Sequence, residues 1–176
     1  MTLLSVNNLT IEFSTDDGAF TAVEGVSFHV GRGESVGLVG ESGCGKSVTA
    51  LGLTRLIPSP PGRIAAGEVQ FDGKDLLKAE RHVMRNIRGS DISMIFQEPL
   101  SALSPLQRIG RQMTEGIGFH RRMSKTEEWE YALSWLKKVG IPDAEERMYA
   151  YPFQLSGGMQ QRVMIAMALM LSPKLI

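Results

Sequence analysis

The sequence has little cysteine, no net charge and no long apolar run. The first and last of these shortages each exclude a class of protein, and the neutral charge withholds support from another. A single cysteine, Cys44, excludes an internal disulfide and agrees with a reducing compartment. Lysine plus arginine and aspartate plus glutamate both number 19, so no charge surplus points to nucleic acid or to an anionic surface. The longest apolar run, residues 163–171, is too short to cross a bilayer, and the amino terminus lacks the basic and apolar regions of a signal peptide. We therefore expect a soluble, cytoplasmic chain of one domain that reaches any membrane through a partner.

Residues 40–47, GESGCGKS, match the phosphate-binding pattern G-x-x-x-x-G-K-[ST] at every fixed position. The apolar run Val36–Val39 predicts a buried strand before the loop, and residues 48–56 predict a helix after it, ended by Pro58. Glycines let main-chain N–H groups turn toward an anion, and the start of the following helix adds partial positive charge. The pattern predicts a nucleoside triphosphate site, with Lys46 on the β- and γ-phosphates and Ser47 on Mg²⁺. The alternative is a glycine-rich turn with one exposed lysine.

Strand and turn patterns surround this loop. Alternation or short apolar runs predict strands over residues 3–13, 22–30, 68–71 and 92–96. Turn residues predict turns at 16–18 and 72–73 and a loop over 58–67.

Helical patterns dominate the second half. Residues 75–88 are polar with helical tendency, Trp129, Leu133, Leu136 and Val139 recur at helical spacing within 105–139, and residues 163–171 predict an apolar helix. Residues 174–176 resemble the opening of another strand. We predict an α/β fold with a parallel-sheet nucleotide-binding core. Residues of about 1–99 would form an antiparallel β subdomain and the core around the phosphate loop, about 100–155 an inserted helical subdomain, and 156–176 a helix and the start of a further strand.

A second anion site is predicted by Leu155–Arg162, LSGGMQQR. A Ser-Gly-Gly turn at the start of a helix offers a hydroxyl and exposed N–H groups to an anion. Two separate phosphate cradles in one chain suggest that each ATP lies between two molecules, one supplying the P-loop and the other the Ser-Gly-Gly helix. The alternative is an ordinary helix cap with glycines for chain flexibility.

These motifs carry a family resemblance. LSGGMQQR resembles the signature motif of ATP-binding-cassette (ABC) ATPases, and Phe96–Pro99 resembles their Q-loop. The stretches GESGCGKSVTA, RGSDISMIFQEPLSALSPL and YPFQLSGGMQQRVMIAMAL resemble the ATPase subunits of bacterial dipeptide, oligopeptide and nickel importers. Phe153 departs from that subfamily, which usually has histidine there.

The resemblance implies a role for each motif residue. Those expected around the triphosphate are Gly40, Gly43, Cys44, Gly45, Lys46, Ser47 and Val48. Ser47 and Gln97 would contact Mg²⁺, and Gln97 would also contact the attacking water. Ser156, Gly157 and Gly158 would touch the γ-phosphate of the ATP held by the other subunit. Phe13 stands where the family stacks an aromatic ring on adenine, with Phe20 as the nearby rival and simple core packing as the alternative.

The resemblance also implies a whole transporter around the chain. The expected function is ATP binding and hydrolysis coupled to uptake of peptides or nickel, at the cytoplasmic face of the cell membrane. The expected partners are a second ABC ATPase subunit, membrane permeases and, indirectly, a periplasmic or lipoprotein solute-binding protein, with no nucleic acid. Two alternatives are a non-hydrolysing ABC remnant and an ABC ATPase that acts without a permease.

One expectation concerns hydrolysis. In the family the strand that begins near Leu175 continues to an Asp that orients Mg²⁺ (the Walker B position) and a Glu that acts as general base, and neither lies within residues 1–176. The family's γ-phosphate-sensing histidine follows them, so His29, His82 and His120 do not correspond to it. We therefore expect a nucleotide-binding domain that stops at the start of the Walker B strand, and that binds ATP without hydrolysing it.

Overall fold

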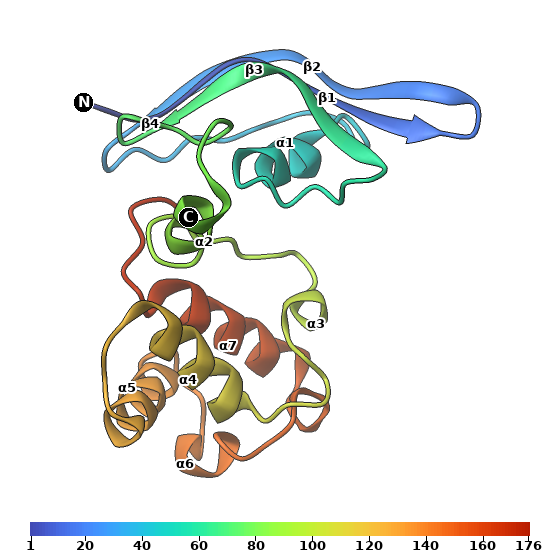
Figure 1. Ribbon diagram of the computed structural model, residues 1–176. Helices are drawn as coiled ribbons and strands as arrows, with labels where there is room; N and C mark the ends of the chain where they lie inside the picture. Colours follow the sequence, from blue (N-terminus) through green and yellow to red (C-terminus); the bar gives the residue numbers. More distant parts are fainter. The chain divides into compact units, whose positions relative to one another are not determined.

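The computed structural model describes all 176 residues, which form two compact units, Met1–Arg85 and Asn86–Ile176. Figure 1 shows the elements of each unit. The first unit holds the sheet and the glycine-rich loop, and the second holds most of the helices.

The first unit is built on a four-stranded antiparallel sheet of order β2-β1-β3-β4. Its strands are β1 (Thr2–Thr15), β2 (Gly18–Gly31), β3 (Gly62–Phe71) and β4 (Lys74–Asp75). Alternating apolar residues of β1, including the fully buried Leu9 and Ile11, face the core. The predicted strands over 3–13, 22–30 and 68–71 and both turns are confirmed. The predicted loop over 58–67 is too long, because residues 62–67 pair with β1 as the first half of β3.

Helix α1 (Lys46–Leu53) packs against β1 (Figure 1). Gly52 makes the close approach possible, because a Cβ there would lie 2.6 Å from Cδ1 of Ile11. The helix begins two residues before the predicted start at Val48 and ends before the predicted end, since Arg55 adopts a φ of 53°.

The prediction of a buried strand over Val36–Val39 is wrong. These residues have no strand assignment, and Val39 is 93% exposed. A strand needs a hydrogen-bonded neighbour, and the sheet of this unit contains only β1 to β4. The apolar character of the run was identified correctly, but burial depends on a neighbour that the run itself does not specify.

The second unit is a helical cluster, preceded by α2 (Arg81–Ile87), which crosses the boundary between the units. Its elements are α3 (Pro99–Ala102), α4 (Ile109–His120), α5 (Lys125–Lys138), α6 (Ala144–Arg147), the short 3₁₀ helix η1 (Pro152–Gln154) and α7 (Gly157–Leu169). Buried side chains of α4, α5 and α7, such as Met113, Leu136 and Val163, form one apolar core. The predicted helical periodicity over 105–139 therefore corresponds to two helices. The predicted apolar helix begins earlier than Val163, at Gly157.

Two further predictions need correction. Residues 75–88 form a helix only over α2, and Asp75 belongs to β4. The inner strand predicted over 92–96 is reduced to single parallel bridges, which Ile92 makes with Arg88 and with Leu175. The bridge to Leu175 agrees with the predicted strand opening at residues 174–176, and Ser93 N–H donates to its carbonyl at 3.0 Å.

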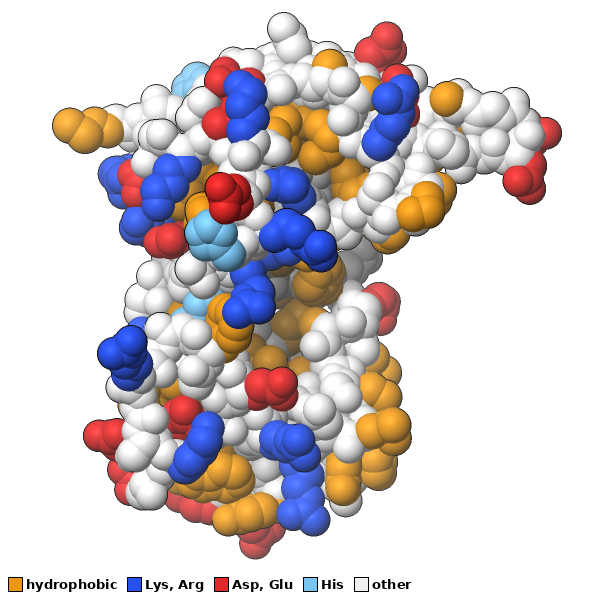
Figure 2. Space-filling view, in the orientation of Figure 1, with side chains coloured by type: hydrophobic (Ala, Val, Ile, Leu, Met, Phe, Trp, Pro, Cys, Tyr) orange, Lys and Arg blue, Asp and Glu red, His pale blue; other side chains and the backbone are white.

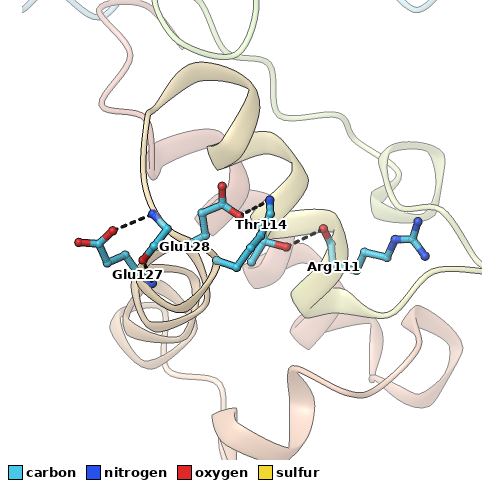
Figure 3. Close-up of polar contacts among 6 residues, drawn as sticks. Arg111, Thr114, Glu127 and Glu128 are labelled. Atoms are coloured by element: carbon cyan, nitrogen blue, oxygen red, sulfur yellow. Dashed lines mark hydrogen bonds and ion pairs between the residues drawn. The ribbon is translucent and has the colours of Figure 1, made fainter.

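Helix α5 starts at a capping box that gives a pH prediction. The Ser124 hydroxyl accepts from the Glu127 N–H, and the Glu127 carboxylate accepts from the Ser124 N–H at 2.7 Å (Figure 3). The Ser124 N–H, and after it the Ser124 side chain, lower the pKa of the Glu127 carboxyl below its ordinary value of 4.5 by hydrogen bonding to the carboxylate. Because the pKa of Glu127 is lower in the folded chain than in the unfolded chain, the ionised carboxylate stabilises the fold. This stabilisation is complete above pH 4.5 and is lost as the pH falls through the lower, folded-state pKa.

We expect Ser124→Ala to raise the pKa of Glu127 toward 4.5, because the substitution removes the hydroxyl and loosens the turn that presents the Ser124 N–H. A carboxyl-detected NMR titration measures the change. Glu145 is the internal control, since the pKa of Glu145 is lowered by Lys137 and not by Ser124. Unchanged titration of Glu127 in Ser124→Ala would contradict the prediction.

Candidate nucleotide-binding site

The glycine-rich loop is fixed to the start of α1 by Gly45. This residue is the N-cap of α1 and has a φ of 88°, a left-handed conformation that favours glycine. A Cβ on Gly45 would also lie 2.5 Å from the Ala22 carbonyl oxygen. The amide and the hydroxyl of the buried Thr49 both donate to the Gly45 carbonyl, at 2.8 and 2.9 Å. The second fixed glycine of the motif is therefore required by conformation and by space together.

The Lys46 side chain folds back over the same loop. Its Nζ donates to the carbonyls of Gly40 at 2.9 Å and Glu41 at 2.6 Å, and lies 3.4 Å from Sγ of Cys44. A Cβ on Gly40 would lie 2.5 Å from that sulfur, so the loop closes tightly here. The carbonyl acceptors carry no net charge, so they hold the ammonium at the loop without neutralising it. Such a cation can bind an anion that enters the loop.

The exposed Ser47 lies in the first turn of α1, beside the half-buried Val48. A hydroxyl oxygen suits a hard divalent cation such as Mg²⁺. The chain has no group of three or more His, Cys, Asp or Glu residues that could hold a metal ion. The role of Ser47 toward Mg²⁺ stays a prediction.

The exposed Cys44 gives a direct probe of this loop. We expect Mg-ATP to slow alkylation of Cys44 severalfold, because phosphates held by the loop would cover the sulfur. The rate of iodoacetamide labelling, followed by mass spectrometry, measures the protection. AMP, which lacks the β- and γ-phosphates, is the matched control. Equal labelling rates with and without Mg-ATP would rule out triphosphate binding at this loop.

The second predicted anion site lies at the start of α7. Ser156 is the N-cap, and its hydroxyl accepts from the Met159 N–H at 3.4 Å. The next residues, Gly157 and Gly158, are exposed, and a Cβ on either would meet no atom within 4 Å. The fold therefore does not need glycine at these two positions, in contrast to Gly45. Glycine at these positions instead leaves room for a bound anion or another molecule to approach the main-chain N–H groups of Gly157 and Gly158 closely.

Sequence reasoning missed the residues that hold this turn in place. The Gln160 side chain is buried, and its Nε2 donates to the carbonyls of Pro152 at 2.8 Å and Leu155 at 3.2 Å. Arg162 donates to the Gly158 carbonyl at 3.3 Å and to the Gly140 carbonyl at 2.8 Å. The signal available in the sequence was the presence of the polar residues Gln160 and Arg162 on an otherwise apolar helix, because a buried side-chain amide needs hydrogen-bond partners.

The remaining predicted residues lie apart from these two loops in the sequence. Gln97 is exposed in a bend just before α3. Phe13 is half-buried in β1, paired with Phe20 of β2 and with Gly62 of β3. A Cβ on Gly62 would lie 2.9 Å from Cε1 of Phe13, so the ring covers this glycine, whereas Phe20 is 60% exposed. Both aromatic assignments stay predictions.

The two units divide the predicted residues between them. The first holds Phe13 and the glycine-rich loop, and the second holds Gln97 and the Ser156–Gly158 turn. None of the helices combines the length and the apolar character needed to cross a membrane.

Comparison with known proteins identifies close relatives. The family described as ABC transporter matches residues 23–176. The chain is 48% identical, over 99% of its length, to 52% of a probable peptide ABC transporter ATP-binding protein of Sinorhizobium fredii. It is 47% identical, again over 99% of its length, to 49% of an oligopeptide transport ATP-binding protein of Bacillus subtilis. The chain thus spans about half the length of the curated relatives it matches.

Solved structures agree with the predicted fold class. A bacterial ABC transporter cassette, solved as a dimer, has a TM-score of 0.83 and 29% identity over 97% of this chain and 70% of its own. The same cassette is known as a dimer in a post-hydrolysis state with ADP and Pi, with the same score and coverage. The predicted α/β cassette fold, with an antiparallel sheet and a helical part, is confirmed. The parallel sheet predicted for its core is wrong for these residues, because the only parallel pairing is the isolated bridges that Ile92 makes.

Proposed function

The chain belongs to the ABC transporter family, and from that premise we propose that it is the ATP-binding part of an importer that takes up peptides. The observation that carries the proposal is the geometry of the two candidate anion sites. One is closed around Lys46, and the other is an exposed Ser-Gly-Gly helix start whose glycines the fold itself does not need. Relatives named for peptide, oligopeptide and dipeptide transport support peptides as the solute class. Nickel remains the second solute that the motifs suggest.

Each ATP would lie between two cassettes. Lys46 and the N–H groups of residues 43–47 would hold the β- and γ-phosphates, and Ser47 with Gln97 would hold Mg²⁺, which supplies charge neutralisation on the phosphates. Ser156, Gly157 and Gly158 of the facing cassette would bind the γ-phosphate from the other side. The facing cassette is a second copy or a related subunit, and the dimeric cassette with a similar fold supports this arrangement. Phe13 would stack on the adenine.

The importer would work at the cytoplasmic face of the membrane. Closure of two cassettes around ATP, and reopening after hydrolysis, would drive membrane permeases that receive solute from a binding protein outside. The 176 residues alone would bind ATP without hydrolysing it, since the family's general base is not among them.

Uptake by cells tests the solute class. Cells in which the gene is disrupted should lose uptake of a radiolabelled tripeptide and regain it when the full gene is restored. Uptake of labelled nickel ion by the same cells is the parallel measurement. Loss of nickel uptake with normal peptide uptake would reject peptides as the solute, and normal uptake of both would reject the importer.

A further inference from the structure

One edge of the sheet in the first unit has no neighbouring strand along most of its length. Strand β3 lies between β1 and β4, but β4 pairs only with Gln70 and Phe71. Residues 62–67 therefore have a strand neighbour, β1, on one side alone, and on the other side the Gly62 N–H donates to the Pro58 carbonyl at 2.8 Å, which leaves residues 63–67 as the open stretch. This stretch is about 17 Å long at about 3.3 Å per residue. An open edge presents main-chain donors and acceptors to any extended chain that reaches it.

A groove of about 520 Å³ follows this open edge. The edge groove lies between residues 62–67 and the segment after α1, with Ile57, Ile64 and Leu77 in its lining. Hydrophobic side chains gather below β3 in Figure 2, with Lys and Arg side chains beside them. Ala65 and Ala66 are exposed and small, so a second main chain can come within hydrogen-bonding distance of β3. The edge groove thus combines an unpaired strand edge with apolar side-chain pockets.

The charge of the lining indicates which partner fits. Its two charged residues are Arg55 and Arg63, and it contains no carboxylate. The Arg55 guanidinium donates to the carbonyls of Leu76 and Ala79, which keep it beside the groove. The Arg63 side chain is 65% exposed and pairs with Glu12, its neighbour on β1. A second copy of this chain, pairing edge to edge, would bring two arginine-lined grooves together and supply no carboxylate from its own lining, so it fits less well than an acidic segment.

We propose that the edge groove binds an extended, acidic segment of a partner protein as an additional strand beside β3. Main-chain hydrogen bonds to residues 63–67 would supply affinity, alternate apolar side chains would enter the groove, and carboxylates would meet the two arginines. This surface is separate from the nucleotide loop and does not depend on the proposed transport function.

The test is binding of a capped peptide that alternates valine with glutamate and matches residues 63–67 in length. Fluorescence polarisation measures its affinity for the whole chain, and amide hydrogen exchange reports on residues 63–67. We expect saturable binding with slowed exchange at these amides, and at least about tenfold weaker binding of the counterpart with lysine in place of glutamate. No saturable binding, or equal binding of both peptides, would overturn the proposal.

Variants separate the groove from general charge effects. Arg63→Glu is expected to weaken binding of the acidic peptide about tenfold, because it replaces a cation with an anion. Ala66→Trp is expected to weaken binding by a similar factor, because the indole ring fills the groove. Lys74→Glu changes the charge equally on the exposed face of β4, outside the lining, and should leave the affinity within about twofold. Circular dichroism and Tm confirm that each variant folds. Equal loss in Arg63→Glu and Lys74→Glu, or concentration-dependent dimers that protect the same amides, would also overturn it.

Discussion

Replacing Lys46 with alanine is expected to weaken Mg-ATP binding by about a hundredfold or more. The Nζ of Lys46 lies over the loop, held by the carbonyls of Gly40 and Glu41. Phosphate oxygens would take over these hydrogen bonds with full negative charge, and hydrogen bonds to charged groups contribute about 1.5–3 kcal/mol each. Loss of two such bonds corresponds to about 3 kcal/mol or more, which is at least a hundredfold in Kd. Titration with a fluorescent ATP analogue measures the affinity.

Two controls separate this loss from damage to the loop. Lys74→Ala removes an exposed lysine of the same unit outside the loop and should leave the affinity unchanged. Lys46→Arg keeps the charge but not the compact ammonium, so we expect intermediate affinity. A Lys46→Ala chain that unfolds at the wild-type temperature and binds Mg-ATP within about threefold of wild type would reject the phosphate role of Lys46.

Local rules in the sequence predicted the parts of the site that depend on local geometry. Gly45 must adopt a left-handed conformation, and Ser156 must cap a helix, and both requirements follow from residues within a few positions along the chain. The motif residues were predicted by the same local rules. The structure adds a second reason for glycine at position 45: a Cβ there would collide with the carbonyl oxygen of Ala22, which lies in β2, far from Gly45 in the sequence.

Predictions that depended on distant neighbours were less successful. The runs at 36–39 and 92–96 are apolar enough for buried strands, but a strand forms only where another strand pairs with it. The second half of the predicted loop over 58–67 is strand because it pairs with residues 10–13 of β1, a register that composition alone does not specify. Gln160 was missed because its acceptors, the Pro152 and Leu155 carbonyls, become visible only in the folded turn.

Replacing Gly158 with aspartate is expected to stabilise the chain slightly and to abolish ATP-dependent pairing of two cassettes. The position is exposed at the start of α7, and a Cβ there meets no atom within 4 Å. An acidic side chain in the first turn of a helix is favourable by about 0.3–1 kcal/mol. The same carboxylate would face the γ-phosphate of the ATP on the other cassette. Two unit charges 4 Å apart repel by about 4 kcal/mol at an effective dielectric constant of 20.

Stability and pairing should therefore change in opposite directions, which a merely structural role for Gly158 does not predict. Thermal unfolding measures the first effect, and sedimentation velocity with Mg-ATP, on wild type and variant in parallel, measures the second. Gly158→Ala is the matched control, because it adds a Cβ without charge and should weaken pairing less than aspartate does. Binding of the fluorescent ATP analogue should stay at the wild-type level in both variants, since Lys46 and its loop are unchanged. If two Gly158→Asp cassettes still pair with each other in Mg-ATP as wild-type cassettes do, the start of α7 does not contact the nucleotide. Other residues must then complete the nucleotide site between the cassettes.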